Sequence, residues 1–265
     1  MKPQHHLFLL MAFAICVQSC KKSSKNSGPS TAKVKYLTQA ITITTSSNGP
    51  TYNSITTYTY NDKKRLSTTK QAVQGSNGQI NISTYTYNGD QLYSIHVTYN
   101  GIVSSDKVFA YNNDGTLKTV ILTTYRNGSV FNTVEYGYVY KDGKVSERHH
   151  EMNYELFTYD SNNNLIKSDG HGQFSIVVTY TYDNKKSLFT GLTTKMELGG
   201  IDIDPAGDRY NTNNVVQQSI TVDSGTTNTS SFVNLVYDSD GYPTGGTTGD
   251  ATNGSKISYT YSTLD

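Results

Sequence analysis

Short runs in which apolar and polar residues alternate recur along the chain, and many of them end in one phrase. The phrase is Tyr-x-Tyr, then Asn or Asp, a few turn-forming residues, and Leu; a near-complete copy is Phe109-Ala110-Tyr111-Asn112-Asn113-Asp114-Gly115-Thr116-Leu117. Both rings of Tyr-x-Tyr leave the same face of an extended chain, which is the two-residue period of a β-strand. Asn, Asp and Gly then favour a reversal. Each copy therefore predicts a strand, a turn and the start of a returning strand.

Copies of this phrase are spread over most of the sequence. They begin at Tyr58, Tyr85, Phe109, Tyr138, Phe157 and Tyr180, with degenerate versions at Leu235 and Tyr259. Between them lie Asn-Gly pairs such as Asn100-Gly101, the strongest local signal for a hairpin turn. The pattern predicts an all-β fold, an antiparallel up-and-down meander of about sixteen strands with the two classes of turn at opposite rims.

One face of the predicted strands is much more apolar than the other. Along 174–182 the even positions are Phe174, Ile176, Val178, Tyr180 and Tyr182, whereas the odd positions are mostly Ser and Thr. Along 130–140 the even positions are again apolar, interrupted by Asn132; they are Val130, Val134, Tyr136, Tyr138 and Tyr140. Ordering each residue costs roughly 1–2 kcal/mol, so the aromatic face has to be covered well. We expect the sheet to curl until this face packs on itself, as a barrel or a half-barrel.

The phrase is missing between residues 183 and 236, a distance of about two repeat units. Here we expect a long loop at 199–214 and a short helix near 185–192, followed by strands at 215–222 and 227–237. The least strand-like part of the predicted domain therefore lies in this gap.

The first twenty residues differ from the rest of the chain. Lys2 precedes an apolar run, Leu7 to Ile15, that is too short to remain as a membrane span. Val17-Gln18-Ser19-Cys20 resembles a bacterial lipobox, in which the Cys is acylated. The resemblance implies a lipoprotein signal peptide at 1–19, a flexible tether at 20–33 and one β domain at 34–265. We expect an exported protein whose lipid on Cys20 holds it to the outer membrane, at the periplasmic or the surface face; the alternative is an ordinary secretory signal cut nearby.

Charge and cysteine content exclude several classes of partner and site. Loss of residues 1–19 would remove one of the 22 Lys and Arg residues, so that 21 basic residues face 21 acidic ones. A balanced charge argues against nucleic acid as a partner, because phosphates need a basic patch. Cys16 would be removed and Cys20 would carry lipid, so the mature domain would hold no disulfide and no Cys-based metal site.

The repeated phrase also resembles a known family. Tyr111 to Leu117 and Tyr237-Asp238-Ser239-Asp240-Gly241 resemble the YD (Rhs-type) repeat. Together with the lipobox, these degenerate repeats resemble cell-envelope lipoproteins of Bacteroidota with a domain of unknown function described as porin-like. The resemblance extends over about residues 36–262, including Tyr182 to Phe189 and Tyr237 to Thr244. It implies a fold, and it implies no catalytic residue.

Two stretches contain residue types that could bind a metal. On a strand, Glu147, His149 and Glu151 would share one face, and carboxylates with imidazole can form a metal site. Asp202, Asp204 and Asp208 lie in a stretch that partly matches the start of a calcium loop, but Ala206 and Asn213 stand where ligands are needed. We favour solvated surface for both stretches and expect no metal and no cofactor.

No sequence motif in the chain points to catalysis. It has no Gly-x-Ser-x-Gly, no P-loop and no dinucleotide fingerprint, and we interpret His96 and His171 as isolated. We therefore expect a protein that is not an enzyme. The favoured function is a cell-envelope binding or interaction module for an unidentified glycan, lipid or protein; the alternatives are a purely structural surface scaffold and, less favoured, an outer-membrane pore.

Overall fold

The computed structural model describes residues 33–46, 51–74, 78–172, 175–192, 212–222, 227–231, 234–249 and 254–264. Residues 33 to 265 form one compact unit. The predicted signal peptide, Cys20 and most of the predicted tether lie outside the described residues.

Seventeen strands and no helix are present in the described residues. Their bounds are β1 Tyr36–Thr45, β2 Tyr52–Tyr60, β3 Leu66–Gln74, β4 Gln79–Asn88, β5 Gln91–Tyr99, β6 Ile102–Tyr111, β7 Leu117–Arg126, β8 Ser129–Lys141, β9 Lys144–His150, β10 Asn153–Tyr159, β11 Leu165–His171, β12 Ile176–Tyr182, β13 Val215–Val222, β14 Thr227–Ser231, β15 Val236–Tyr237, β16 Pro243–Gly249 and β17 Gly254–Ser262. The same part of the chain contains no helix long and apolar enough to cross a bilayer.

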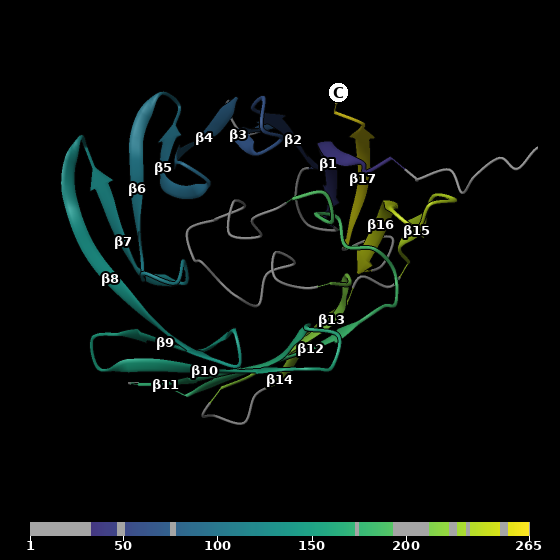
Figure 1. Ribbon diagram of the computed structural model, residues 1–265. Coiled ribbons are helices and arrows are strands. Elements are labelled where there is room, and N and C mark those ends of the chain that lie inside the picture. Colours follow the sequence, from purple (N-terminus) through teal and green to yellow (C-terminus); the bar gives the residue numbers. More distant parts are fainter. Residues whose placement is uncertain are drawn as a thin grey trace, which may run out of the picture. The chain divides into compact units, whose positions relative to one another are not determined.

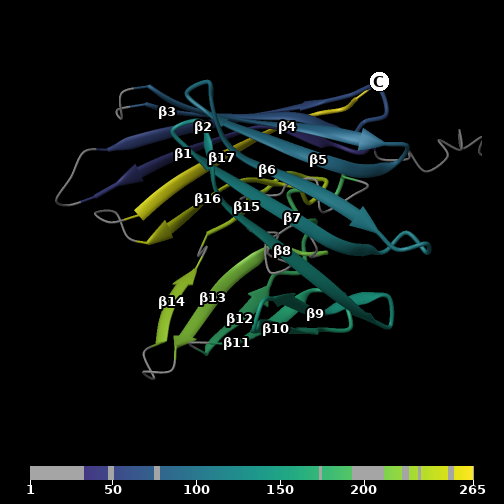
Figure 2. The ribbon, with the colours of Figure 1, turned by 90° about the vertical axis from the view of Figure 1, so that its left-hand side faces the viewer.

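All pairings in the sheet are antiparallel, and nearly all join strands that are consecutive in the sequence. β1 to β14 follow one another as an up-and-down meander, and β15, β16 and β17 form a second run. β17 pairs with β1, so the last strand lies beside the first (Figure 1). The sheet curls (Figure 2), but no pairing among the described residues joins β14 to β15 or β16. The predicted all-β meander is confirmed, and the sheet is not closed into a barrel.

The phrase has the same local geometry in successive hairpins. A β-bulge precedes the second aromatic residue, which then pairs with the first or second residue of the returning strand. These pairs are Tyr60 with Leu66, Tyr87 with Leu92, Tyr111 with Leu117, Tyr140 with Val145 and Tyr159 with Leu165. A bulge adds local twist, so its repetition at one rim favours a curled sheet.

Side-chain oxygens and left-handed residues form the phrase turns. Asn61 Oδ1, for example, accepts hydrogen bonds from the backbone N–H groups of Lys63 and Arg65 at 3.1 and 3.0 Å. Lys64 adopts a φ of 59°, and Gly115 takes the corresponding place in a later copy with a φ of 84°. At the opposite rim Asn100 and Gly101 both have positive φ, as a type I′ hairpin turn requires. The two turn classes lie at opposite rims as predicted, except that Asp142 and Gly143, both with positive φ, form a short two-residue turn at the rim of the phrase turns.

One face of the sheet carries the core. Four leucines in the first or second position of the returning strands are at most 1% exposed; they are Leu66, Leu92, Leu117 and Leu165. The first rings of the phrases pack with them; these rings are Tyr85, Phe109, Tyr138, Phe157 and Tyr180. We call this side of the sheet the core face.

The expected helix near 185–192 is wrong. The backbone instead makes two successive turns, with Thr190 N–H bonded to Ser187 O at 3.1 Å and Leu192 N–H to Phe189 O at 3.0 Å. Tertiary contacts hold the segment: Leu192 is in the core, and the Phe189 ring meets Tyr58 edge-on with centroids 6.3 Å apart. Most of the predicted 199–214 loop lies outside the described residues.

Candidate ligand pocket

Five neighbouring strands, β8 to β12, position a group of side chains on the core face. Arg148 stands opposite the core residue Tyr138 on one side and Glu155 on the other. Glu155 in turn stands opposite Gly170, and Gly170 opposite Ile176. Because paired residues in a sheet point to the same side, these positions form one row across the core face.

This row borders a pocket of about 390 Å³. Its lining consists of Tyr136, Arg148, His150, Asn153, Tyr154, Glu155, Ser168, Gly170, His171, Ile176 and Val178. Nearer the phrase turns the same strands carry the bulky core residues Phe157 and Leu165. Farther along β11 the core face has only Ser168 and Gly170, and these small residues leave the space open.

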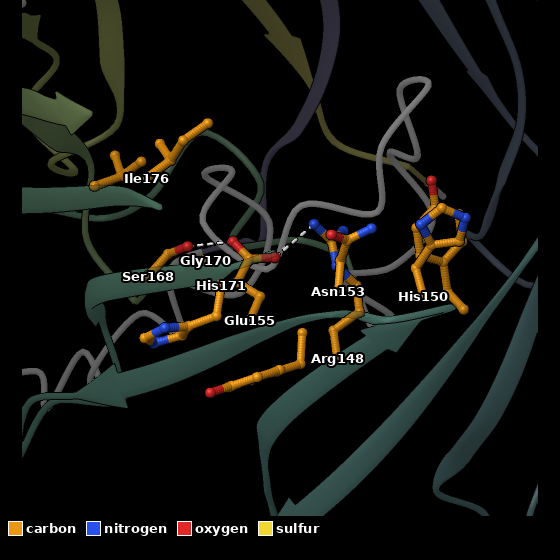
Figure 3. Close-up of a pocket in the computed structure, with 11 residues that line it drawn as sticks. Arg148, His150, Asn153, Glu155, Ser168, Gly170, His171 and Ile176 are labelled. Carbon is orange, nitrogen blue, oxygen red and sulfur yellow. Dashed lines mark hydrogen bonds and ion pairs between the residues drawn. The ribbon is translucent and has the colours of Figure 1, made fainter. Parts of the chain in front are cut away.

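The floor of the pocket is a connected polar network. Arg148 Nη2 lies 2.6 Å from Glu155 Oε2, and both side chains are less than one-fifth exposed. The Ser168 hydroxyl, whose residue is buried, donates a hydrogen bond to the other oxygen of Glu155. Figure 3 shows Glu155 between Ser168 and Arg148, with Asn153 beside Arg148. Glu155 is thus held from both sides.

The two sides of the pocket are aromatic and aliphatic. On one side the rings of Tyr136 and His150 lie with centroids 5.2 Å apart, and the Arg148 guanidinium carbon is 5.4 Å from the Tyr136 ring centre. On the other side Ile176 and Val178 of β12 supply apolar surface. The pocket therefore has a polar floor between less polar walls.

A neutral phenol lies next to the network. Burial raises the pKa of Tyr138 well above its ordinary value, although the positive charge of Arg148 opposes this shift. Tyr138 therefore remains protonated across the physiological pH range, and it adds no charge to the core face beside Arg148.

The structure brings together only part of the predicted Glu147, His149 and Glu151 set. Glu147 Oε1 and His149 Nδ1 are 3.3 Å apart on the face opposite the core. Glu151 follows the end of β9, and its φ of 53° places it in the turn, where its carboxylate is 3.9 Å from His150 Nε2. The strand period does not extend to Glu151 because the chain reverses there.

The other stretch considered as a metal site lies outside the described residues; its residues are Asp202, Asp204 and Asp208. Within the described residues, no group of three or more His, Cys, Asp and Glu side chains is arranged to hold a metal ion.

The two histidines interpreted as isolated both have partners. His96 Nδ1 is 2.6 Å from Asp106 Oδ1, and the Tyr125 hydroxyl donates to the other Asp106 oxygen at 2.8 Å. His171 stacks on Tyr154 with ring centroids 4.7 Å apart. These partners lie on adjacent strands, so the contacts depend on register, but His171 Nε2 also lies 3.3 Å from Asp169 Oδ1 on its own strand.

Sequence reasoning also missed the polar floor. Arg148 and Glu155 are equally distant from the turn at 151–152, so the hairpin places their opposite charges directly across from each other. That symmetry was the available signal. Ser168 and Gly170 carry no comparable signal, because only the β10–β11 register brings them to the same place.

Comparison with solved structures supports the fold. A porin-like protein from Bacteroides uniformis matches with a TM-score of 0.56 and 14% sequence identity, over 85% of this chain and 98% of that one. The two proteins share a fold. At this identity the likeness shows the fold alone. The expected resemblance to porin-like proteins is therefore confirmed for the architecture.

Two further structures match at lower TM-scores. A porin-like protein from Bacteroides vulgatus has a TM-score of 0.39 and 12% identity, over 87% of this chain and 100% of that one. A chain of the TcdB2-TccC3-Cdc42 crystal structure has a TM-score of 0.30 and 14% identity, over 80% of this chain and 14% of that one. No protein-family model matches the sequence, and a search of curated proteins also finds no match.

Proposed function

We propose that the protein is a non-catalytic binding module of the bacterial cell envelope, and that it holds a small polar ligand in the pocket on β8 to β12. The observation that carries this proposal is the Arg148–Glu155–Ser168 network at the floor of a 390 Å³ pocket. Ligand pockets typically measure about 300–1,000 Å³ and combine apolar walls with a few convergent polar groups. The pocket fits this description in both size and composition.

The polar groups of the pocket favour binding over catalysis. Ser168 donates its proton toward Glu155, and Glu155 also contacts Arg148. A serine nucleophile needs a base aligned to remove its proton, usually a histidine that a third group orients. The paired arrangement here suits the recognition of hydroxyl and amide groups.

A purely structural scaffold is the alternative function, and a pore is the less favoured one. The core cluster includes Phe109, Val120 and Leu192, which fill part of the core face. This filling supports a binding module or a scaffold more than a water-filled channel. Only the binding module requires a ligand in the pocket, so ligand retention separates it from the scaffold.

The test is native mass spectrometry of the mature, full-length protein purified in detergent from its own cells. We expect one ligand per chain. Tyr136→Ala removes the aromatic wall and should lose the ligand, whereas Tyr93→Ala, on an exposed residue of β5, should keep it. Wild-type protein without any bound ligand would contradict the binding module and favour the scaffold.

We propose that lipid on Cys20 anchors the protein, and this part has its own test. Cys20→Ser should move the protein from the membrane fraction to the soluble envelope fraction after cell breakage. Several acyl chains give stable anchoring where a single chain is marginal. Unchanged membrane association of the variant would overturn lipid anchoring and leave the pocket proposal intact.

A further inference from the structure

The charges that line the pocket already neutralise each other. Arg148 and Glu155 contact at 2.6 Å, and the other lining residues are Ser, Asn, Gly, His, Tyr and aliphatic side chains. An anionic ligand would have to separate Arg148 from Glu155 or place its charge beside that of Glu155. Breaking a partly buried pair leaves an uncompensated charge, which is strongly unfavourable. An uncharged ligand avoids this cost.

The network presents hydrogen-bond donors and acceptors side by side. Arginine has five N–H donors and a carboxylate has about four acceptor positions. The Glu155 carboxylate accepts from both Arg148 and Ser168, and Arg148 also interacts with the Tyr138 hydroxyl. Asn153 offers a further donor and acceptor at the same edge of the pocket. Neighbouring donors and acceptors on one floor match a ligand with adjacent hydroxyl groups, because each hydroxyl both donates and accepts.

The walls favour a ring with non-polar faces. Tyr136 and His150 present aromatic surface on one side, and Ile176 and Val178 present aliphatic surface on the other. A sugar ring carries C–H groups on its faces and hydroxyl groups around its edge. The volume of 390 Å³ corresponds to roughly thirteen water molecules at about 30 Å³ each, enough for about one or two such rings.

We propose that the ligand is an uncharged carbohydrate, with ring hydroxyls on Arg148, Glu155 and Asn153 and a ring face against Tyr136. This inference rests on the proposed function, since it specifies the ligand class of the same pocket. It also predicts more than the binding of some polar ligand. The preference for neutral sugars over charged ones should depend on Glu155, because Glu155 neutralises Arg148.

The probes are the methyl glycosides of glucose, galactose, mannose and xylose, together with glucuronate and galacturonate. Binding to the mature protein is measured by isothermal titration calorimetry and by saturation-transfer NMR. We expect at least one neutral glycoside to bind at least tenfold more tightly than either uronate. Tyr136→Ala should weaken that binding at least tenfold, while Tyr93→Ala should leave it unchanged.

Glu155→Gln tests the charge argument directly. The variant leaves Arg148 without its carboxylate partner, so uronate binding should rise at least tenfold relative to neutral sugar. Glu147→Gln is the matched control, because Glu147 lies on the opposite face of the same sheet, and it should leave the preference unchanged. Circular dichroism establishes that both variants are folded.

The outcomes separate the two proposals. Wild-type protein that prefers uronates, or binds no sugar of the panel while it retains another ligand by native mass spectrometry, overturns the carbohydrate inference and leaves the binding module standing. Protein that binds no sugar and retains no ligand overturns both. A Glu155→Gln variant with unchanged preference also overturns the inference, because the preference would then not depend on the Arg148 charge.

Discussion

In five copies of the phrase, the second tyrosine ties its hairpin to the strand before it. Its hydroxyl meets a backbone group of a leucine in the first or second position of the preceding strand. The hydroxyls of Tyr60, Tyr87, Tyr111 and Tyr182 donate to the carbonyls of Leu37, Leu66, Leu92 and Leu165 at 2.7, 2.8, 2.7 and 2.5 Å. Tyr140 instead accepts from the Leu117 N–H at 3.2 Å. The repeat thus couples neighbouring units as well as forming each one.

Tyr87→Phe should measure the strength of one such tie. The Arg65 guanidinium carbon lies 4.0 Å from the centre of the Tyr87 ring. A phenylalanine ring can keep this contact, so the substitution removes the hydroxyl alone. We expect the free energy of unfolding to fall by about 1–2 kcal/mol, because a buried carbonyl loses a partner. Urea denaturation followed by circular dichroism provides the measurement. Tyr93→Phe, on a half-exposed ring, is the control and should stay within about 0.5 kcal/mol of wild type; an equal loss in both variants would refute a special role for Tyr87.

The acidic residue after the second tyrosine gives the fold a pH dependence. Burial alone would raise the pKa of Asp160, but hydrogen bonds from the backbone and amide of Asn164 and from the Asn162 N–H, with the charge of Lys144, outweigh it and hold the pKa below its ordinary value. A depressed folded-state pKa stabilises the protein above the unfolded pKa of about 3.9. That stability is lost as the pH falls through the lower, folded-state pKa.

The difference in unfolding free energy between wild type and Asp160→Asn should therefore become smaller at low pH. Asparagine stands at this position in other copies, at Asn61 and Asn112, so its amide oxygen can fill the same place in the turn. We expect the variant to be less stable than wild type above about pH 5 and to converge with it below about pH 4. Urea unfolding at a series of pH values checks this. Asp90→Asn, on a side chain that is 93% exposed, is the control, and a constant gap for Asp160→Asn at all pH values would argue against the charge effect.

At the scale of elements, local pattern predicted the regular hairpins almost residue by residue. The copy of the phrase that begins at Tyr58 predicts a strand to Tyr60, a turn and a return at Leu66, and these are the end of β2 and the start of β3. Local information suffices there because turn chemistry and the two-residue period point to the same register.

The sequence could not predict elements whose position depends on the rest of the molecule. The predicted strand at 227–237 is divided into β14, which pairs with β13, and β15, which pairs with β16. Both pieces are extended, so no local period marks the division. The phrase turn after β12 is also interrupted: Asp183 accepts from the N–H of Asn214 at 3.1 Å, as Asp160 accepts from that of Asn164 at 2.8 Å. The segment between Asp183 and Asn214 therefore takes the place that residues 161–163 occupy between Asp160 and Asn164. In the pocket floor, hairpin symmetry could have predicted the Arg148–Glu155 pair, whereas Ser168 and Gly170 reach the floor only through the β10–β11 register.

At the scale of the whole sheet, side chains make contacts between the two runs of strands in addition to the backbone pairing of β1 with β17. The Tyr237 hydroxyl on β15 donates to the Asp183 carboxylate in the turn after β12. Burial and this hydrogen bond raise the pKa of Tyr237, so the phenol stays protonated and remains a donor. Nearby, Lys186 Nζ lies 4.6 Å from the centre of the Tyr242 ring. Lys186 thus adds a contact between the turn after β12 and the turn before β16.

Tyr237→Phe should loosen this junction without unfolding the rest of the sheet. The substitution removes the donor and leaves the partly buried Asp183 with its contacts to Asn214. We expect amide hydrogen exchange in β13 and β16 to accelerate about tenfold, while β4 to β7 keep their protection, because their ties run through Tyr87 and Tyr111. Tyr93→Phe should change neither region. A uniform loss of protection across all strands would instead mean that the curled sheet opens only as one cooperative unit, and that the Tyr237–Asp183 bond stabilises the whole sheet and not its junction.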